Sequence, residues 1–292
     1  HNDARRQRQM CIRDRPSLDD LKKRIASVKS TQKITKAMKM VAAAKLRKAQ
    51  EAAEQSRPYA DNMKNLMDSI SRGFIQTDSS RNLLTGSDED KTYLLVLFTS
   101  ERGLCGGFNS QISKSLKEKI VELQKQNKEV KIICIGKKGY DIIKRQYSEL
   151  IVDTIDLSEI KSVQYGDAKE ISDRIIKMYF DAEFDKCLIF YNKFKSVISQ
   201  VPTEQQVVPA EIVEQTDNED KVMDNNFIEF EPNEKEILEE LLPLNFAVQI
   251  FKALLESSAS EQGSRMSAMD NASRTASDMI DSLTLFYNRS RQ

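Results

Sequence analysis

The sequence predicts an α/β fold with a long coiled coil, in which N- and C-terminal helices form an antiparallel shaft beside a Rossmann-like α/β domain. Steps of three and four alternate without a break from Ile237 to Phe286 along a mostly apolar series, which is the spacing of a left-handed coiled coil. A second helical pattern starts near Ser17, and strands alternate with helices between the two. Helices at opposite chain ends can pair only when the middle of the chain folds back and returns.

The N-terminal shaft helix is expected over residues 17–72. Ser17, followed closely by two acidic residues, is typical of a helix start, since acidic side chains favour the positive end of the helix dipole. The helical pattern then continues with one interruption, at Pro58. Residues 1–16 are Arg-rich, have no helical period and contain the single histidine, so we interpret them as a non-native or disordered leader.

The Rossmann-like α/β domain is expected over residues 91–208. Three apolar runs predict buried strands, and a more polar run that carries Pro202 predicts an edge strand; in chain order they are Thr92–Thr99, Val130–Ile135, Lys186–Tyr191 and Lys195–Val208. Helical patterns lie near Ser110–Gln126, Tyr140–Gln146 and Asp167–Phe180. Strands that alternate with helices predict a mostly parallel, doubly wound sheet.

An acidic linker is expected over residues 209–233, and the C-terminal shaft helix over residues 234–292. Pro243 is expected in the first turn of this helix, where its missing N–H costs little. The seam of the helix comprises Ile237, Leu241, Leu244, Val248, Phe251, Leu255, Ser258, Gln262, Arg265, Met269, Ala272, Ala276, Met279, Leu283 and Phe286. The polar side chains in the middle of this seam predict packing that differs from that of a plain zipper.

Few residues could carry catalysis. The glycine-rich turn Arg102–Asn109 follows a predicted strand, but its spacing matches neither a dinucleotide fingerprint nor a P-loop, so a tight strand-to-helix turn is the favoured interpretation. A nucleotide-binding α/β enzyme with a coiled-coil appendage stays open as the alternative. The sequence has no histidine beyond His1 and four scattered cysteines, which leaves no Cys–His nucleophile and no metal-ligand spacing. We therefore predict no catalytic residue, no cofactor and no metal site.

Positive charge is concentrated in residues 21–50, which contain ten Lys or Arg and no Asp or Glu. Nucleic acid, an anionic membrane surface and an acidic protein surface are the three partners that such a segment could bind. Nucleic-acid binding is disfavoured because aromatic residues are not interleaved with the cations, and membrane binding because the apolar face lacks bulky anchors. An acidic protein partner is therefore favoured. The longest apolar runs of the chain are too short to span a bilayer.

From about residue 17 to residue 292 the chain resembles the gamma subunit of F-type, proton-translocating ATP synthases. The motifs that carry the resemblance, in family order, are Ser30–Gln50 (STQKITKAMKMVAAAKLRKAQ), Ser56–Ala60 (SRPYA), Thr99–Asn109 (TSERGLCGGFN), Tyr191–Pro209 (YNKFKSVISQVPTEQQVVP) and Arg265–Gln292 (RMSAMDNASRTASDMIDSLTLFYNRSRQ). Motifs of this length are specific to the family.

The resemblance implies that the two terminal helices wind into an antiparallel coiled coil with a Rossmann-like domain near its base. It also implies a central-stalk rotor subunit that performs no bond chemistry itself. Its implied partners are three alpha and three beta subunits around one gamma subunit, the small epsilon subunit (delta in mitochondria), and the membrane-embedded ring of proton-carrying c subunits. Proton flow would turn the ring and shaft, and the shaft would drive each catalytic beta subunit through its states. The implied location is peripheral, on the cytoplasmic face of a bacterial inner membrane, in preference to the matrix face of the mitochondrial inner membrane.

The resemblance also implies which residues contact those partners. Met38 and Arg265 match positions that face the acidic lever segment of the beta subunits, and the cations around Met38 would complement that acid. The expected contact residues are Met38, Lys39, Lys45, Arg47, Arg265 and Met269 at the lever, and Asn288, Arg289, Arg291 and Gln292 in the upper cavity of the hexamer. Because the family sequence continues beyond this motif, the shaft tip is expected to be missing, and no inserted regulatory cysteine pair is seen.

Overall fold

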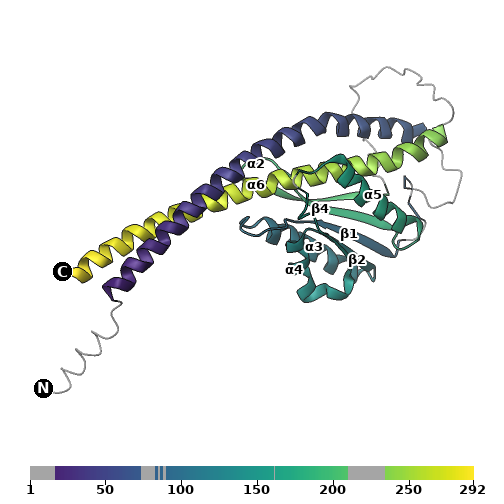
Figure 1. Cartoon of the computed structure of the whole chain (residues 1–292). Helices are drawn as coiled ribbons and strands as arrows, with labels where there is room; N and C mark the ends of the chain where they lie inside the picture. Colours follow the sequence, from purple (N-terminus) through teal and green to yellow (C-terminus); the bar gives the residue numbers. More distant parts are fainter. Residues whose placement is uncertain (1–16, 74–82, 85, 88–89, 161, 210–233) are drawn as a thin grey trace, which may run out of the picture.

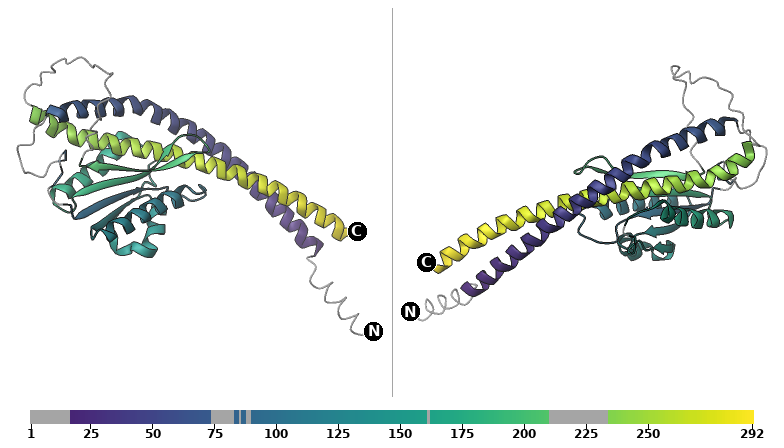
Figure 2. Two further views of the ribbon diagram at one scale, coloured as in Figure 1. Left: turned by 180° about the vertical axis from the view of Figure 1, so that it is seen from behind. Right: turned by 45° about the horizontal axis from the view of Figure 1, so that its top comes forward.

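The computed structural model describes residues 17–73, 83–84, 86–87, 90–160, 162–209 and 234–292. Two long helices, α2 (Leu18–Gly73) and α6 (Glu234–Arg291), lie side by side and form a rod, and an α/β domain packs against one part of it (Figure 1). The start of α2 and the end of α6 project together beyond the domain, as Figure 2 also shows. At about 1.5 Å per residue, the 56 residues of α2 span about 84 Å. The predicted combination of shaft and domain is confirmed.

The first turn of α2 has the expected cap. The Ser17 hydroxyl accepts a hydrogen bond from the Asp20 amide at 3.1 Å and donates one to the Asp20 carboxylate at 2.8 Å. The helix then continues through Pro58, where an interruption was predicted. Proline removes one backbone hydrogen bond from a helix, and here packing of α2 against its partner outweighs that loss.

The two long helices pair in antiparallel register. Lys22 near the start of α2 lies 5.9 Å from the ring centroid of Tyr287 near the end of α6, whereas Asp61 pairs with Lys252 at 3.2 Å. Most buried positions on α2 are spaced by seven or fourteen residues, with one offset of four: Leu21, Thr35 and Ala42, then Leu46, Ala53, Ala60 and Met67, and Met63 is buried beside this series. The small side chains in this series let the two backbones approach closely.

The predicted seam of α6 holds in part. Val248, Leu255, Met269 and Ala276 are buried, but Met279 and Phe286 are 48% and 44% exposed. Beyond the domain, α2 is the one element among the described residues that covers α6, and the seam is half exposed there. Alongside the domain, the buried face of α6 is wider than the seam, because α6 packs on the sheet as well as on α2. Pro243 lies inside this helix and not in its first turn, since α6 begins at Glu234.

The domain is built on a five-stranded sheet with the order β3-β2-β1-β4-β5. The strands are β1 (Thr92–Phe98), β2 (Glu129–Ile135), β3 (Ile151–Ile155), β4 (Lys186–Phe194) and β5 (Gln200–Val208). The helices are α3 (Phe108–Lys125), α4 (Lys137–Tyr147) and α5 (Tyr165–Phe180), with a short 3-10 turn at Ser148–Leu150. The first four strands of the sheet order pair in parallel and β5 pairs antiparallel to β4, so the predicted mostly parallel sheet is confirmed.

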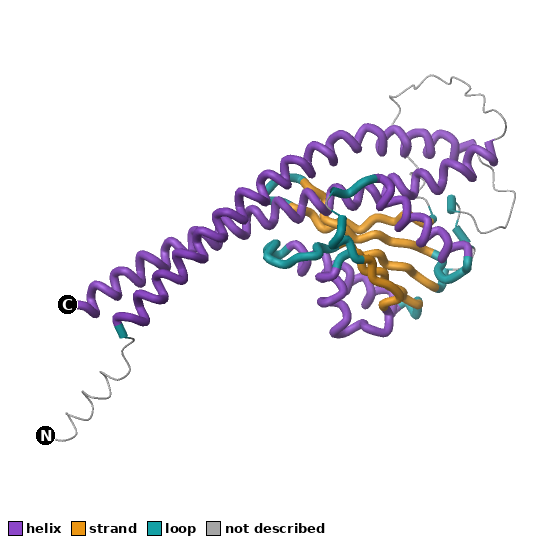
Figure 3. The backbone as a smooth tube through the Cα atoms, in the orientation of Figure 1, coloured by secondary structure: helices purple, strands orange, loops and turns teal. Residues whose placement is uncertain are grey.

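Helices cover both faces of the sheet (Figure 3). Leu95 and Leu97 of β1 pack with Ile112 and Leu116 of α3, and with Ile143 of α4. The alternate residues of β1 pack against the other face, where Ile171 and Ile175 of α5 meet Phe246 and Ile250 of α6. One shaft helix is therefore also a layer of the domain core, because successive side chains of a strand point to opposite faces.

Sequence reasoning missed β3. The strand lies at the edge of the sheet and its side chains alternate between half-buried and exposed, so it lacks the continuous apolar run that marked β1 and β2. The predicted strand at Lys195–Val208 begins later, at Gln200, after a turn. The predicted leader and nearly all of the acidic linker lie outside the described residues. Among the helices that are described, none combines the length and the apolar content needed to cross a membrane.

Candidate functional site

The glycine-rich turn docks onto α6. The Ser264 hydroxyl donates a hydrogen bond to the carbonyl oxygen of Cys105 at 2.6 Å, and the Arg265 guanidinium donates to the carbonyls of Arg102 and Gly103 at 3.2 and 3.4 Å. Gly106 has φ +56°, and a Cβ there would lie 3.3 Å from the Ser264 hydroxyl. Glycine thus allows both the left-handed backbone and the close approach of the helix.

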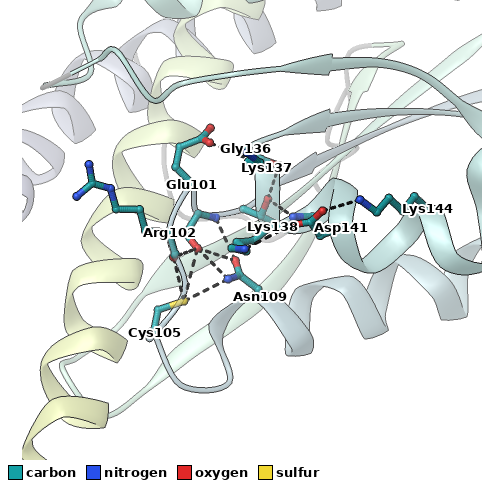
Figure 4. Close-up of polar contacts among 12 residues, drawn as sticks. Glu101, Arg102, Cys105, Asn109, Gly136, Lys137, Lys138, Asp141 and Lys144 are labelled. Carbon is teal, nitrogen blue, oxygen red and sulfur yellow. Dashed lines mark hydrogen bonds and ion pairs between the residues drawn. The ribbon is translucent and has the colours of Figure 1, made fainter. Parts of the chain in front are cut away.

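Inside the turn, polar side chains hold the backbone in shape (Figure 4). The Asn109 carboxamide accepts from the Ser100 amide at 3.0 Å, and donates to the Ser100 hydroxyl at 2.8 Å and to the Cys105 sulfur at 3.2 Å. Glu101 accepts hydrogen bonds from the amides of Leu157 at 2.8 Å and Lys137 at 3.3 Å. These contacts make the turn a rigid docking platform at the carboxyl end of β1.

A nucleotide site would be expected at the crevice where the strand order reverses, between the carboxyl ends of β1 and β4. Here α6 passes over this crevice. The Ser260 hydroxyl donates to the Asn192 carbonyl at the end of β4, at 2.9 Å, and Ser264 one turn further on holds the turn after β1. The geometry favours a docking role for the glycine-rich turn over a phosphate cradle.

The predicted lever residues of α2 lie on one segment of the rod. Lys39 forms an ion pair with Asp270 of α6 at 2.5 Å, and its side chain is 40% exposed. Met38 is half-buried and Lys45 is exposed. Arg47 is also exposed and pairs with Glu51 on its own helix at 3.1 Å. Most cations of residues 21–50 are exposed, so α2 presents a basic surface.

The predicted lever residues of α6 are less accessible. The Arg265 side chain is 12% exposed and pairs with Glu261 at 2.5 Å. Burial raises the pKa of Glu261, and the positive charge of Arg265 partly offsets this rise. The Met269 side chain is buried, since the residue is only 5% exposed. A groove of about 720 Å³ brings Arg265 and Lys45 together between the two helices and the carboxyl ends of β1 and β2.

The four predicted residues at the end of α6 are exposed: Asn288, Arg289, Arg291 and Gln292. They lie at the projecting end of the coiled coil, far from the sheet (Figure 1). The structure therefore separates the two predicted groups along the rod.

Sequence reasoning missed the acidic residues of α6 that hold these cations. Asp270 pairs with Lys39 and also with Arg274 at 2.8 Å, and Glu261 pairs with Arg265. The i,i+4 spacing of Glu261–Arg265 and Asp270–Arg274 was a readable signal. The pairing with Lys39 was not readable, because it depends on the register between helices more than two hundred residues apart.

Comparison with known proteins decides the family. A family model described as ATP synthase matches residues 17–292. The ATP synthase gamma chain of Pelagibacter ubique is 55% identical over 276 residues, which is 94% of this chain and 94% of that relative. The gamma chain of Paracoccus denitrificans is 54% identical over 277 residues, 95% of this chain and 94% of the relative. The chain belongs to the ATP synthase gamma-chain family. The resemblance stated from the sequence motifs is thereby confirmed.

Solved structures agree with membership of the gamma-chain family. A chain from the central stalk and c-ring of Tetrahymena thermophila mitochondrial ATP synthase aligns with a TM-score of 0.61 and 30% identity, covering 82% of this chain and 99% of that chain. A chain from the rotor of Euglena gracilis mitochondrial ATP synthase aligns with a TM-score of 0.65 and 18% identity, covering 94% and 97%. The second likeness supports the fold alone. Gamma chains are subunits of a larger, membrane-associated complex.

Proposed function

We propose that this chain is the central-stalk rotor subunit of an F-type ATP synthase, and that it couples proton-driven rotation of a membrane ring to conformational cycling of catalytic beta subunits. The chain itself carries out no bond chemistry, and ATP is made or hydrolysed on other subunits. The observation that carries the proposal is the projecting coiled coil, in which two helices from opposite ends of the chain extend beyond the domain as a bare rod (Figures 1 and 2).

The physical properties of the rod suit a shaft. Antiparallel pairing of two long helices resists bending better than a single helix, and ion pairs such as Lys39–Asp270 and Asp61–Lys252 fix the register. The rod is also asymmetric, because α6 packs on the sheet while α2 faces solvent with a basic surface. A shaft must be asymmetric to act differently on each surrounding subunit as it turns.

We assign the contacts with the beta subunits to the basic segment of α2 and the adjoining part of α6. Lys39, Lys45 and Arg47 would attract an acidic lever segment, Met38 would offer apolar contact beside them, and Arg265 and Met269 would support this surface from α6. The exposed end of α6 would enter the upper cavity of the hexamer through Asn288, Arg289, Arg291 and Gln292. The exposure of most cations of this segment supports the assignment.

The remaining partners follow from the same role. Three alpha and three beta subunits would surround the rod, while the epsilon subunit and the c-subunit ring would contact the base of the stalk. Because the two gamma chains that share more than half of their residues with this chain are bacterial, we place the complex on the cytoplasmic face of the inner membrane, with this chain held there through the ring.

Co-expression of the chain with alpha and beta subunits of a close relative tests the proposal. We expect one complex on gel filtration, with ATPase activity above that of alpha and beta alone. A Lys45→Glu/Lys48→Glu variant should lower that activity, whereas Lys114→Glu/Lys125→Glu on α3 of the domain should not. A chain that elutes alone and leaves the ATPase unchanged would contradict the rotor role, and ATP binding by the isolated chain in equilibrium dialysis would favour the nucleotide-binding alternative.

A further inference from the structure

Glu256 of α6 joins three elements at one buried carboxylate. Its side chain is 2% exposed. One carboxylate oxygen accepts hydrogen bonds from Nε and Nη2 of Arg57 on α2, at 3.1 and 2.9 Å. The other accepts from the backbone amide of Phe194, the last residue of β4, at 2.9 Å. Both shaft helices and the sheet therefore meet at this side chain.

The local packing makes the junction rigid. One turn along α6, the Ser260 hydroxyl holds the Asn192 carbonyl, two residues before Phe194. At Gly263 the helix comes so close to the sheet that a Cβ would lie 3.2 Å from the Phe194 ring. A buried carboxylate is costly without partners, so the three donors define a narrow set of positions for it.

Other ion pairs between the two helices differ from this one. Lys39–Asp270 and Asp61–Lys252 join α2 to α6 only, and in the second pair the Asp61 side chain is 64% exposed. An exposed ion pair of this kind restrains the orientation of its partners less than a buried, fully hydrogen-bonded one. Among the described residues, Glu256 combines near-complete burial with contacts to α2 and to the sheet.

We propose that Glu256 is a positioning residue that fixes the angle between the domain and the helix pair, so that torque applied to either is transmitted to the other. Apolar side chains of α6 pack into the domain core and hold the domain on that helix. The Phe194 bond adds a directional restraint between α6 and the sheet, and the Arg57 bonds tie α2 to the same point. The mechanical role rests on the proposed rotor function, whereas the geometric role concerns the chain alone.

Distance measurements on the isolated full-length chain test the geometric role. Spin labels at Ala44→Cys on α2 and Lys125→Cys on α3, in a Cys11→Ser background, report the angle between helix pair and domain as a distribution of distances. We expect Glu256→Gln to broaden this distribution, and the matched control Asp61→Asn to leave it unchanged. An unchanged width in Glu256→Gln would overturn the proposal. If the single variant does not fold, Arg57→Gln/Glu256→Gln, which leaves no unpaired charge, provides the same comparison.

The assembled, membrane-reconstituted complex tests the mechanical role. We expect Glu256→Gln to hydrolyse ATP at the wild-type rate while pumping fewer protons per ATP, because the domain follows the turning shaft less faithfully. Wild-type pumping per ATP in this variant would overturn the transmission of torque. A wild-type chain that fails to assemble would count against the rotor function instead, and the label distances would still decide whether Glu256 fixes the angle.

Discussion

Lys39 of α2 and Asp270 of α6 form an ion pair at 2.5 Å across the coiled coil, just past the segment of α6 that contacts the domain. Asp270 also binds Arg274 on its own helix at 2.8 Å. One carboxylate thus holds two cations, and its ion pair with Lys39 links the basic segment of α2 to α6. Most of the other cations of that segment are exposed to solvent, where an acidic partner could reach them.

The first prediction concerns the pH range in which Asp270 stabilises the rod. The hydrogen bond from Lys39 holds the pKa of Asp270 below its usual value of 3.8. A lowered acid pKa contributes stability above the unfolded-state pKa, and the contribution is lost as pH falls through the folded-state pKa. We expect Asp270→Asn to melt earlier than wild type at pH 6 to 8. The difference should begin to shrink below about pH 4, where the unfolded chain takes up the proton, and should vanish only below the lowered folded-state pKa.

Thermal melts followed by circular dichroism measure this difference across the pH range. Asp281→Asn, which removes an exposed carboxylate further along the same helix, is the matched control for loss of one charge. A gap between Asp270→Asn and wild type that persists in acid would show that the carboxylate acts through packing and not through its charge.

The second prediction concerns Glu261, whose pKa shifts in the opposite direction. Burial raises the pKa of Glu261 above its usual value of 4.5, and the nearby Arg265 offsets part of the rise. A raised acid pKa means that the folded chain binds the proton more tightly than the unfolded chain, so stability falls as pH rises between the two pKa values. We expect the stability of wild type relative to Glu261→Gln to decline from about pH 4.5 upward and then to level off.

Urea titrations at stepped pH values give the relevant free energies of unfolding. Glu118→Gln provides the matched control, since it removes an exposed carboxylate from another i,i+4 pair, with Lys114. A relative stability that rises with pH would mean that the Arg265 charge outweighs burial at this site.

The architecture could be predicted because it depends on patterns that are local in the sequence. Heptad spacing marked α6, and continuous apolar runs marked β1 and β2, since a buried parallel strand has no solvent-facing side. The edge strand β3 escaped because half of its side chains face water. Pro58 and Pro243 misled the prediction because helix packing overrides the local preference of proline.

The candidate site was less predictable than the fold. The basic segment of α2 could be found from composition. Composition could not show that Met269 is buried and Arg265 nearly so, because burial depends on which elements meet in the folded chain. The junction at Glu256 had no sequence signal for the same reason. Its partners Arg57 and Phe194 lie far from it in the chain and are brought together by the register of the rod on the sheet.

The third prediction concerns Gly136, at the turn after β2. Its φ is +96°, and a Cβ would lie 2.3 Å from the carbonyl oxygen of Thr99, so the backbone itself would have to shift. We expect Gly136→Ala to lose about 3 kcal/mol or more of folding stability by urea denaturation. Gly166→Ala is the control, because a Cβ there meets nothing within 4 Å and the residue lies in α5. The control should be as stable as wild type or slightly more stable. Equal losses of folding stability at the two positions would contradict the steric argument.

The fourth prediction concerns the docking of the glycine-rich turn on α6, with Cys105 as its reporter. Cys105 is buried beneath the contact that the Ser264 hydroxyl makes with its carbonyl oxygen at 2.6 Å. Ser264→Ala removes this hydrogen bond and leaves the Phe108 amide, at 3.3 Å, as a donor to the Cys105 carbonyl oxygen. The loss costs about 1 kcal/mol, so the turn should open more often. In a Cys11→Ser background, a thiol reagent at pH 8 should then label Cys105 faster than in the parent.

Two internal comparisons make the labelling experiment decisive. Burial raises the pKa of Cys134 to about 12, so this thiol should stay unlabelled in both proteins unless the whole domain unfolds. Thr284→Ala removes a hydroxyl that bonds only within α6, to Ile280, and should leave the rate at Cys105 unchanged. Faster labelling of Cys105 and Cys134 together would indicate global destabilisation, whereas faster labelling of Cys105 alone would establish that Ser264 holds the turn on the shaft.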